Sequence, residues 1–358
     1  MNILALTKYD TLGASSRMRM LQYSAVVTSE GHSIKFSPLF SNSYVEELQQ
    51  NKRHWLQVCV AYCKRIYLLI SLRGVDILWI EKECLPWIPA WLETFLLSKS
   101  IPYIIDYDDA VFHLYDQHKN PLIRFCLKGK HPRLIQKASQ VIVGNDYLFN
   151  YAATFRADNI HIIPTVIDLE RYSLQTSSES IVKTDRICFG WIGQHSTAYN
   201  LEFLQGIFKT FLSEFNVSFC AIGINASAEG LSMQSIEWTA ETEVQNLQKF
   251  DIGIMPLTDG LFEHGKCGYK IIQYMACGIP VIASPIGINT KIIQHGVNGF
   301  LASTESEWRD AMQTLILDDD LRRSMGDAGR KMIEQEYCLQ VTSPKFIELL
   351  HNACSKKG

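Results

Sequence analysis

Short runs of Val, Ile and Leu recur along the chain, each followed by an amphipathic segment, and this alternation is the feature that most limits its fold. In the first half the runs lie at residues 2–7, 32–38, 75–82, 101–109 and 140–145. Continuous apolar strands separated by helices are typical of a parallel sheet covered on both faces. The pattern starts again in the second half, at residues 186–193, 217–223, 234–239, 250–257, 279–284 and 299–303. Two such series predict an α/β protein made of two doubly wound, Rossmann-like domains.

The stretch between the two series sets the expected domain boundary. "IHIIPTVIDLERY" (160–172) ends the first series, and Pro164 with the polar "SLQTSSES" (173–180) indicates a linker. We therefore expect an N-terminal domain at 1–165, a C-terminal domain at 166–340 and an amphipathic helix within 341–358. Packing of that helix back on the N-terminal domain is one alternative.

Ligands of open α/β sheets bind beyond the carboxyl ends of the strands. We expect the two domains to face each other across a cleft, with the functional residues on the loops at 8–17, 106–113, 191–199 and 258–270.

Composition excludes several classes of protein. The formal net charge is -3, which argues against nucleic acid as a main partner. The ten cysteines form no C-x-x-C pair and no zinc-spaced cluster with histidine, so buried thiols in a reducing compartment are expected. The start "MNILALTKYD" lacks the pattern of a signal peptide, and no apolar run approaches the ~18 residues of a membrane span. We expect a cytoplasmic protein, with a peripheral position on the inner face of the cell membrane as the alternative.

The stretch "GLFEHGKC", Gly260 to Cys267, has the glycine and lysine spacing of a Walker A loop. That motif needs Ser or Thr after the lysine to ligate magnesium, and Cys267 is a poor ligand for a hard cation. A strand nevertheless runs into this loop and a helix follows it, and helix N-termini bind anions. We therefore expect a phosphate site, in which the glycines permit close approach and the lysines supply charge: Gly265, Lys266, Gly268 and Lys270. The alternative is an exposed loop with incidental lysines.

These residues belong to a longer series of motifs. In the second half it comprises "FGWIGQHSTAYNLEFL", "DIGIMPLTD", "EHGKCGYKIIQYMACGIPVIAS", "GVNGFL" and "LRRSMGDAGRKMIEQEY"; in the first half, "GASSRMRMLQY" and "IIDYDDAVF". The series resembles the group 1 (family 4) glycosyltransferases over nearly the whole chain, most strongly over 186–340. The resemblance implies the GT-B fold, with a nucleotide-sugar donor on the C-terminal domain and a saccharide or lipid-linked acceptor on the N-terminal domain. It also implies an EC 2.4 transferase that retains anomeric configuration and needs no metal or other cofactor, with a role in cell-surface polysaccharide synthesis such as lipopolysaccharide or capsule.

The chain departs from the family pattern in its charged residues. The family usually carries two glutamates at a fixed spacing, and these positions fall on Gly265 and Gln273 here. Gln273 can still hydrogen-bond a ribose hydroxyl as a neutral group, and Glu263 is the candidate substitute for the first acid. No Arg or Lys follows the glycine of the "GWIG" turn, so we expect Lys266 and Lys270 to meet the charge of the leaving diphosphate. By this resemblance the chain belongs to a branch of the family that has "GKCGxKxxQYMA" in place of the usual two-glutamate motif.

Further donor-binding candidates lie on other loops. Gly13 and Arg17 are expected to approach the donor phosphates, with Arg17 preferred to Arg19; the alternative for Arg17 is a surface position. Gly193 and Thr197 open the C-terminal domain. Trp238 is expected to stack on the base, or else to belong to the core.

The sequence "DYDD" offers Asp108 and Asp109 as the base toward the acceptor hydroxyl. Its D-x-D pattern holds a metal in a different transferase fold, and the two-domain pattern argues against that reading. The alternative for these acids is capping of the following helix. His113 and His195 also lie near strand ends, where a lone histidine is more often structural than catalytic.

Two stretches, 51–74 and 124–137, mix Lys and Arg with Trp, Tyr or Leu. This pattern is typical of helices at a membrane surface, which would suit a lipid-linked acceptor. The alternative is ordinary amphipathic helices that cover a sheet. Two rival functions remain: an isomerase of the same fold, as in the nucleotide-sugar 2-epimerases, and a transferase-like domain without activity.

Overall fold

A computed structural model describes residues 1–49, 54–97, 101–173 and 186–355. The polar linker expected at 173–180 lies outside the described residues from 174 onward, as do residues 51–53 of the first basic stretch. The chain divides into two compact units. The first contains Met1–Val166, Gly265–Cys267 and the residues from Thr342 onward, and the second contains Ile167–His264 and Gly268–Val341.

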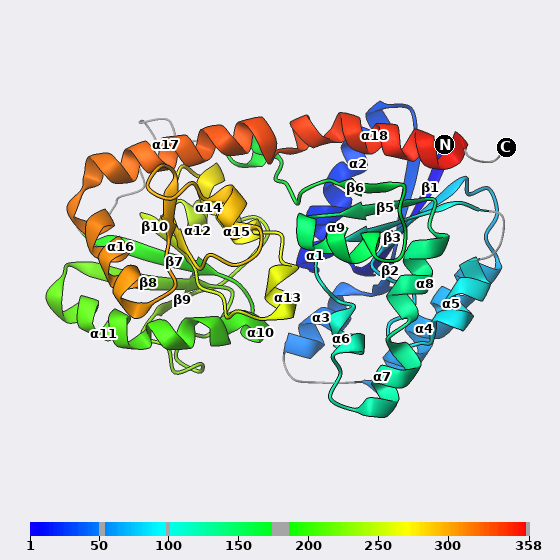
Figure 1. Ribbon diagram of the computed structural model, residues 1–358, viewed down its shortest axis with the longest axis horizontal. Helices are drawn as coiled ribbons and strands as arrows, with labels where there is room; N and C mark the ends of the chain where they lie inside the picture. The colour runs from blue at the N-terminus through cyan, green and yellow to red at the C-terminus, as the bar shows by residue number, and fades with distance from the viewer. Residues whose placement is uncertain (50–53, 98–100, 174–185, 356–358) are drawn as a thin grey trace. The chain divides into compact units, whose positions relative to one another are not determined.

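The first unit is built on a six-stranded parallel sheet in the order β2-β1-β3-β4-β5-β6 (Figure 1). Its strands are β1 (Asn2–Tyr9), β2 (Ser33–Phe40), β3 (Ile77–Glu81), β4 (Tyr103–Tyr107), β5 (Gln140–Val143) and β6 (Ile160–Ile162). The first five were expected from the sequence. The edge strand β6 was not, because it has three half-buried residues that do not stand out as an apolar run.

The second unit repeats this plan, with a six-stranded parallel sheet in the order β12-β11-β10-β7-β8-β9. Its strands are β7 (Ile187–Ile192), β8 (Val217–Ile222), β9 (Gln234–Ile236), β10 (Ile252–Met255), β11 (Val281–Ala283) and β12 (Gly299–Leu301). All six were expected. The α/β class with two doubly wound, Rossmann-like sheets is therefore confirmed.

Helices cover both sheets. In the first unit they are α1 (Ala14–Arg19), α2 (Ser24–Ser29), α3 (Asn42–Gln49), α4 (Trp55–Ile70), α5 (Ala90–Leu97), α6 (His113–Asp116), α7 (Pro121–Leu127), α8 (Lys130–Lys137), α9 (Asp146–Ala153) and most of α18 (Leu339–Ser355). In the second they are α10 (His195–Ala198), α11 (Gln205–Glu214), α12 (Glu243–Leu247), α13 (Leu261–His264), α14 (Tyr269–Ala276), α15 (Asn289–Ile292), α16 (Glu305–Leu317) and α17 (Asp319–Glu336). Helices α1 and α2 are separate because the backbone leaves the helical region at Met20 (φ -126, ψ -54).

Helix α18 completes the core of the first unit. Phe346 is buried, and its ring centroid lies 4.4 Å from that of Trp79 and 4.7 Å from that of Tyr23. The Tyr23 hydroxyl also forms a 3.0 Å hydrogen bond with Thr342 Oγ1. The end of the chain thus covers β3 through one aromatic cluster. Within the described residues, every helix falls short of the length and apolarity needed to cross a membrane.

We predict that Phe346→Ala lowers the free energy of unfolding by about 3–5 kcal/mol, because it empties a packed aromatic site. Urea denaturation followed by tryptophan fluorescence measures the change. Phe95→Ala is the matched control, since Phe95 lies in the same unit but is 70% exposed. Equal effects of the two substitutions would contradict the role given to α18.

Candidate active site

The carboxyl ends of β1, β3, β4 and β5 are neighbours in the first sheet, and the residues that follow them are mostly polar. Glu81 closes β3 opposite Asp106 of β4, and Lys82 comes next. Asp108 and Asp109 follow β4. Because parallel strands end at the same edge, these side chains meet although they are distant in sequence.

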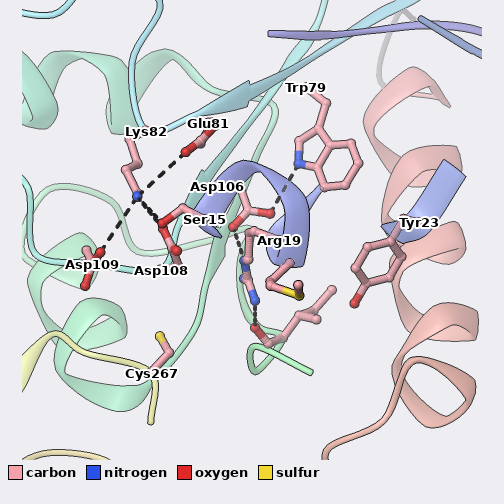
Figure 2. A network of polar contacts seen from close by, with 12 residues as sticks. Ser15, Arg19, Tyr23, Trp79, Glu81, Lys82, Asp106, Asp108, Asp109 and Cys267 are labelled. Atoms are coloured by element: carbon pink, nitrogen blue, oxygen red, sulfur yellow. Dashed lines mark hydrogen bonds and ion pairs between the residues drawn. The ribbon is translucent and has the colours of Figure 1, made fainter. Parts of the chain in front are cut away.

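Lys82 is the centre of this group (Figure 2). Its Nζ lies 2.6 Å from Asp108 Oδ1, 3.8 Å from Glu81 Oε1 and 3.9 Å from Asp109 Oδ2, and it donates to Ser15 Oγ at 3.2 Å. The backbone of Lys82 is left-handed (φ 62), which is unusual for a residue with a side chain. One buried ammonium therefore holds three carboxylates and the first turn of α1.

The two acids after β4 differ in their surroundings. Burial opposes ionisation of Asp108, but the ion pair with Lys82 prevails and lowers its pKa. Burial and the neighbouring Asp108 carboxylate raise the pKa of Asp109 to about 6, against the opposing charges of Lys82 and Lys266. The Asp109 side chain is also 28% exposed. Of the two predicted bases, Asp109 is better suited to accept a proton near neutral pH.

A second buried ion pair lies beside the first. Arg19 Nε donates to Asp106 Oδ1 at 2.6 Å, Trp79 Nε1 donates to Asp106 Oδ2 at 3.2 Å, and Arg19 Nη1 donates to the Ile163 carbonyl at 2.6 Å (Figure 2). The structure thus commits Arg19 to the core, while Arg17 is half-buried and donates to the Thr11 carbonyl at 2.9 Å.

Both acids of the D-x-D pattern in "DYDD" lie beside a basic side chain of the protein. Asp106 is paired with Arg19 and Asp108 with Lys82, so both acids of the pattern already have a cation. Across the described ranges, no three or more His, Cys, Asp or Glu side chains gather in a group that could hold a metal.

The loop after β1 is fixed to the same edge. Gly13 is the N-cap of α1. Ser16 Oγ donates to Glu81 Oε2 at 2.6 Å, and the Lys8 amide donates to the same oxygen at 2.9 Å. The hydroxyls of the "GASSR" motif therefore bind carboxylates and cations of the sheet edge.

The predicted phosphate loop contributes three residues to the first unit. Asn145, which follows β5 and caps α9, donates from Nδ2 to the carbonyls of Gly265 at 3.0 Å and Lys266 at 2.9 Å. Gly265 packs on Ala110, and Cys267 is buried against Gly144. Lys266 is half-buried and close enough to Asp109 to influence its pKa. One amide thus fixes the backbone on which Lys266 stands.

In the second unit, Lys270 lies in the first turn of α14, and its Nζ is 4.0 Å from the ring centroid of Trp191. A Cβ on Gly193 would lie 2.9 Å from that Nζ and would collide with the Trp191 ring, so only glycine fits after β7. Gly268 caps α14 with a left-handed backbone (φ 67), which glycine adopts most easily. The helix has no side-chain cap and no acid in its first turn. This arrangement suits an anion.

Gln273 lies in a buried polar network behind this site. It is 2% exposed, and its Nε2 donates to the Tyr172 hydroxyl at 3.2 Å. The same hydroxyl donates to Glu243 Oε1 at 3.2 Å, and Trp238 Nε1 donates to Glu243 Oε2 at 2.7 Å. A glutamate at position 273 would place a second carboxylate beside Glu243, which explains why a neutral amide suits this position.

The other predicted residues have protein partners. The Thr197 hydroxyl takes part in the capping box of α10 with Gln194. Glu263, which is 8% exposed, accepts from the Tyr199 hydroxyl at 2.8 Å. Trp238 is half-buried.

The two histidines also have protein partners. His113 lies between Asp116 and the Tyr147 hydroxyl, 2.8 Å from each, and His195 pairs with Glu229.

Among the residues of the site, Lys82 and Asn145 were not singled out from the sequence. Lys82 and Asn145 are the last residues of the predicted runs 75–82 and 140–145, so a search of every strand end would have found them. Nothing local in the sequence separates Glu243 from an ordinary acid at a helix start.

Parts of the chain are similar in sequence to known glycosyltransferases. Residues 186–318 match the protein family described as "Glycosyl transferases group 1". The chain is 32% identical over 79 residues to N-acetyl-alpha-D-glucosaminyl L-malate synthase of Bacillus anthracis, which is 22% of this chain and 21% of that protein. It is 39% identical over 62 residues to D-inositol 3-phosphate glycosyltransferase of Corynebacterium jeikeium, or 17% of this chain and 15% of that protein. The chain spans much less than two thirds of the length of these relatives.

Solved structures extend the likeness to the whole chain. Sucrose-phosphate synthase from Thermosynechococcus elongatus matches with a TM-score of 0.70 at 12% identity, over 99% of each chain. Anabaena HepE in complex with UDP-glucose matches with a TM-score of 0.71 at 15% identity, over 98% of this chain and 99% of that one. The fold is thus that of the GT-B glycosyltransferases. The match of residues 186–318 to the group 1 glycosyl transferases and the named relatives support a glycosyltransferase enzyme.

We predict that Asn145→Ser speeds tryptic cleavage after Lys266 roughly tenfold or more, because it removes two hydrogen bonds while a hydroxyl still caps α9. Limited proteolysis with mass spectrometry measures the rate. Asn120→Ser is the control, since Asn120 caps α7 through the same kind of bond, to the Leu122 amide at 2.9 Å. If both substitutions speed cleavage alike, Asn145 does not hold this loop.

Proposed function

We propose that this chain transfers a sugar from a nucleotide-diphosphate-sugar donor to a hydroxyl of a saccharide or a lipid-linked saccharide. The observation that carries the proposal is the Lys270 ammonium, held 4.0 Å above Trp191 at the start of α14 and beside the Gly193 turn. This cation lies within the segment that matches the group 1 glycosyl transferases. The proposal includes retention of anomeric configuration, which the resemblance to that family implies, and a role in cell-surface polysaccharide synthesis.

The chemistry requires a positive site for the leaving group. The bond from the anomeric carbon to the β-phosphate oxygen breaks, the new glycosidic bond forms to the acceptor oxygen, and the diphosphate leaves with increased negative charge. Lys270, the N-terminus of α14 and the Gly193 turn are arranged to receive that charge, and Lys266 is the second cation. Because side chains of the protein supply the positive charge, we propose that no metal is needed.

For the donor base, Trp238 and the buried network of Glu243, Tyr172 and Gln273 are the candidate contacts. Trp238 is half-buried, and its indole N–H is already bound to Glu243, so its ring is oriented before a ligand arrives. One of the structural neighbours is a complex with UDP-glucose, which makes uridine diphosphate sugars the first donors to test.

On the acceptor side we propose Asp109 as the group that takes the proton of the attacking hydroxyl. Its pKa of about 6 leaves the carboxylate ionised at neutral pH but still basic, whereas the ion pair with Lys82 weakens Asp108 as a base. Lys82 then acts as a positioning residue, since it fixes both acids at the sheet edge.

We predict that Lys270→Met lowers kcat with a UDP-sugar by roughly 10²–10³-fold, because it removes a fixed charge from the leaving group. Release of UDP in the presence and absence of acceptor measures turnover and separates transfer from isomerisation of the donor. Lys209→Met, an exposed lysine of α11, is the control. EDTA is expected to leave turnover unchanged. Full activity of Lys270→Met, or loss of activity with EDTA that magnesium restores, would refute the charge assignment.

The raised pKa of Asp109 predicts the pH dependence. Since the ionised carboxylate accepts the proton, kcat/KM is expected to rise as pH increases through about 6 and to fall as the group is protonated below that value. Asp109→Asn should lower kcat/KM by roughly 10²–10⁴-fold and abolish this acidic limb. An unchanged acidic limb in Asp109→Asn would assign the titration to another group, such as Asp106, whose pKa burial also raises to about 6.

A further inference from the structure

Three helices of the first unit expose apolar side chains where water-facing helices normally carry polar ones. On α4, Leu56, Val60, Tyr67 and Ile70 recur at helical spacing, and their side chains are 43–78% exposed. On α5, Trp91 and Phe95 stand one turn apart and are 64% and 70% exposed. Helix α7 adds Leu122 and Phe125, 68% and 77% exposed. Exposed apolar side chains that gather on neighbouring elements mark an interaction site.

These helices are close neighbours. Helix α5 packs against both α4 and α8, and two residues join α7 to α8. Figure 1 shows the same grouping within the first unit. We call the exposed residues of α4, α5, α7 and α8 the apolar-basic face.

The charge of this face is of one sign. The four helices carry a single acidic residue, Glu93, and it is buried against Lys130. Exposed basic residues lie on these helices and on the two-residue link between α7 and α8: Lys64, Arg124, Lys128, Arg133 and Lys137. The whole chain has a net charge of -3, so this excess of positive charge is local.

From this pairing of exposed apolar and basic side chains, we propose that the apolar-basic face binds the surface of an anionic lipid bilayer. Aromatic and aliphatic side chains enter the headgroup boundary, and Lys and Arg side chains attract anionic lipids. A second copy of the chain fits less well, because a self-complementary interface would bring like charges together. A free polyanion such as RNA would use the charges but not the aliphatic stripe of α4.

The proposal goes beyond glycosyl transfer and is tested without any donor or acceptor, so its failure and that of the proposed reaction are distinguishable. Vesicles of phosphatidylcholine, with and without phosphatidylglycerol, are floated with the full chain. We expect binding only when phosphatidylglycerol is present, and weaker binding as salt increases.

Two double variants separate the components of the face. Arg124→Gln with Lys128→Gln should weaken vesicle binding about thirtyfold, from about 1 kcal/mol for each basic side chain near an anionic surface. Trp91→Ser with Phe95→Ser should weaken it on the order of tenfold or more, through lost apolar burial. The matched control is Lys209→Gln with Leu317→Ser, two exposed residues of the second unit. All substituted side chains are exposed, and thermal melts check that each variant folds.

Several outcomes would overturn the proposal. Absence of binding to the anionic vesicles rules the face out as a bilayer site, and equal loss in the control double variant assigns binding to general charge or hydrophobicity. A dimer that Trp91→Ser with Phe95→Ser converts to monomer, with vesicle binding unaffected, would make a second copy the occupant. Tight binding of RNA that is insensitive to the aromatic variant would make a polyanion the partner.

Discussion

The pairing of buried charges at the carboxyl edge of the first sheet is the constraint on which the rest of that unit depends. A parallel sheet brings Glu81, Asp106, Asp108 and Asp109 to one edge, where repulsion between carboxylates would oppose folding. Lys82 and Arg19 offset that repulsion, and the loss of either would leave an uncompensated buried charge. Of the three acids around Lys82, Asp109 lies farthest from its ammonium, at 3.9 Å, and its pKa is raised by burial and by the neighbouring Asp108 carboxylate. The group proposed for proton transfer is thus a product of the way the sheet edge is neutralised.

Eleven of the twelve strands could be located from apolar runs alone, because a strand buried on both faces leaves a continuous signature. The side-chain pairs of the candidate active site could not be predicted from the apolar runs. The alternation of apolar and polar residues identifies strand ends, but which side chains pair across them depends on strand order, which brings β3 between β1 and β4. That order explains why Lys82 was missed and why Arg19 is buried beside Asp106. The break at Met20 and the capture of Gly265–Cys267 by Asn145 likewise depend on non-local packing.

The second unit shows how neighbouring residues determine each other's identity. Gly193 is required because the Trp191 ring and Lys270 already occupy the space where a side chain would stand. Gln273 shares the Tyr172 hydroxyl with Glu243, so the network already contains its acid. The amide of Gln273 therefore stands where a second buried carboxylate would be repelled by Glu243. The network thus holds one carboxylate, and Gln273 adds a hydrogen bond without a second charge.

The division of the chain between the two units has a consequence for its evolution. The first unit is assembled from three separate segments, since it includes Gly265–Cys267 and the residues from Thr342 onward. Recombination that joined residues 1–166 to the second half of a relative would replace both of these short segments. Asn145 would then have to bind a different tripeptide, and Trp79 would have to pack against a different helix. A chimaera of this kind should fold only when these short segments are kept with the N-terminal half. The segments that pack into one unit are thus not the segments that a single cut in the gene would separate.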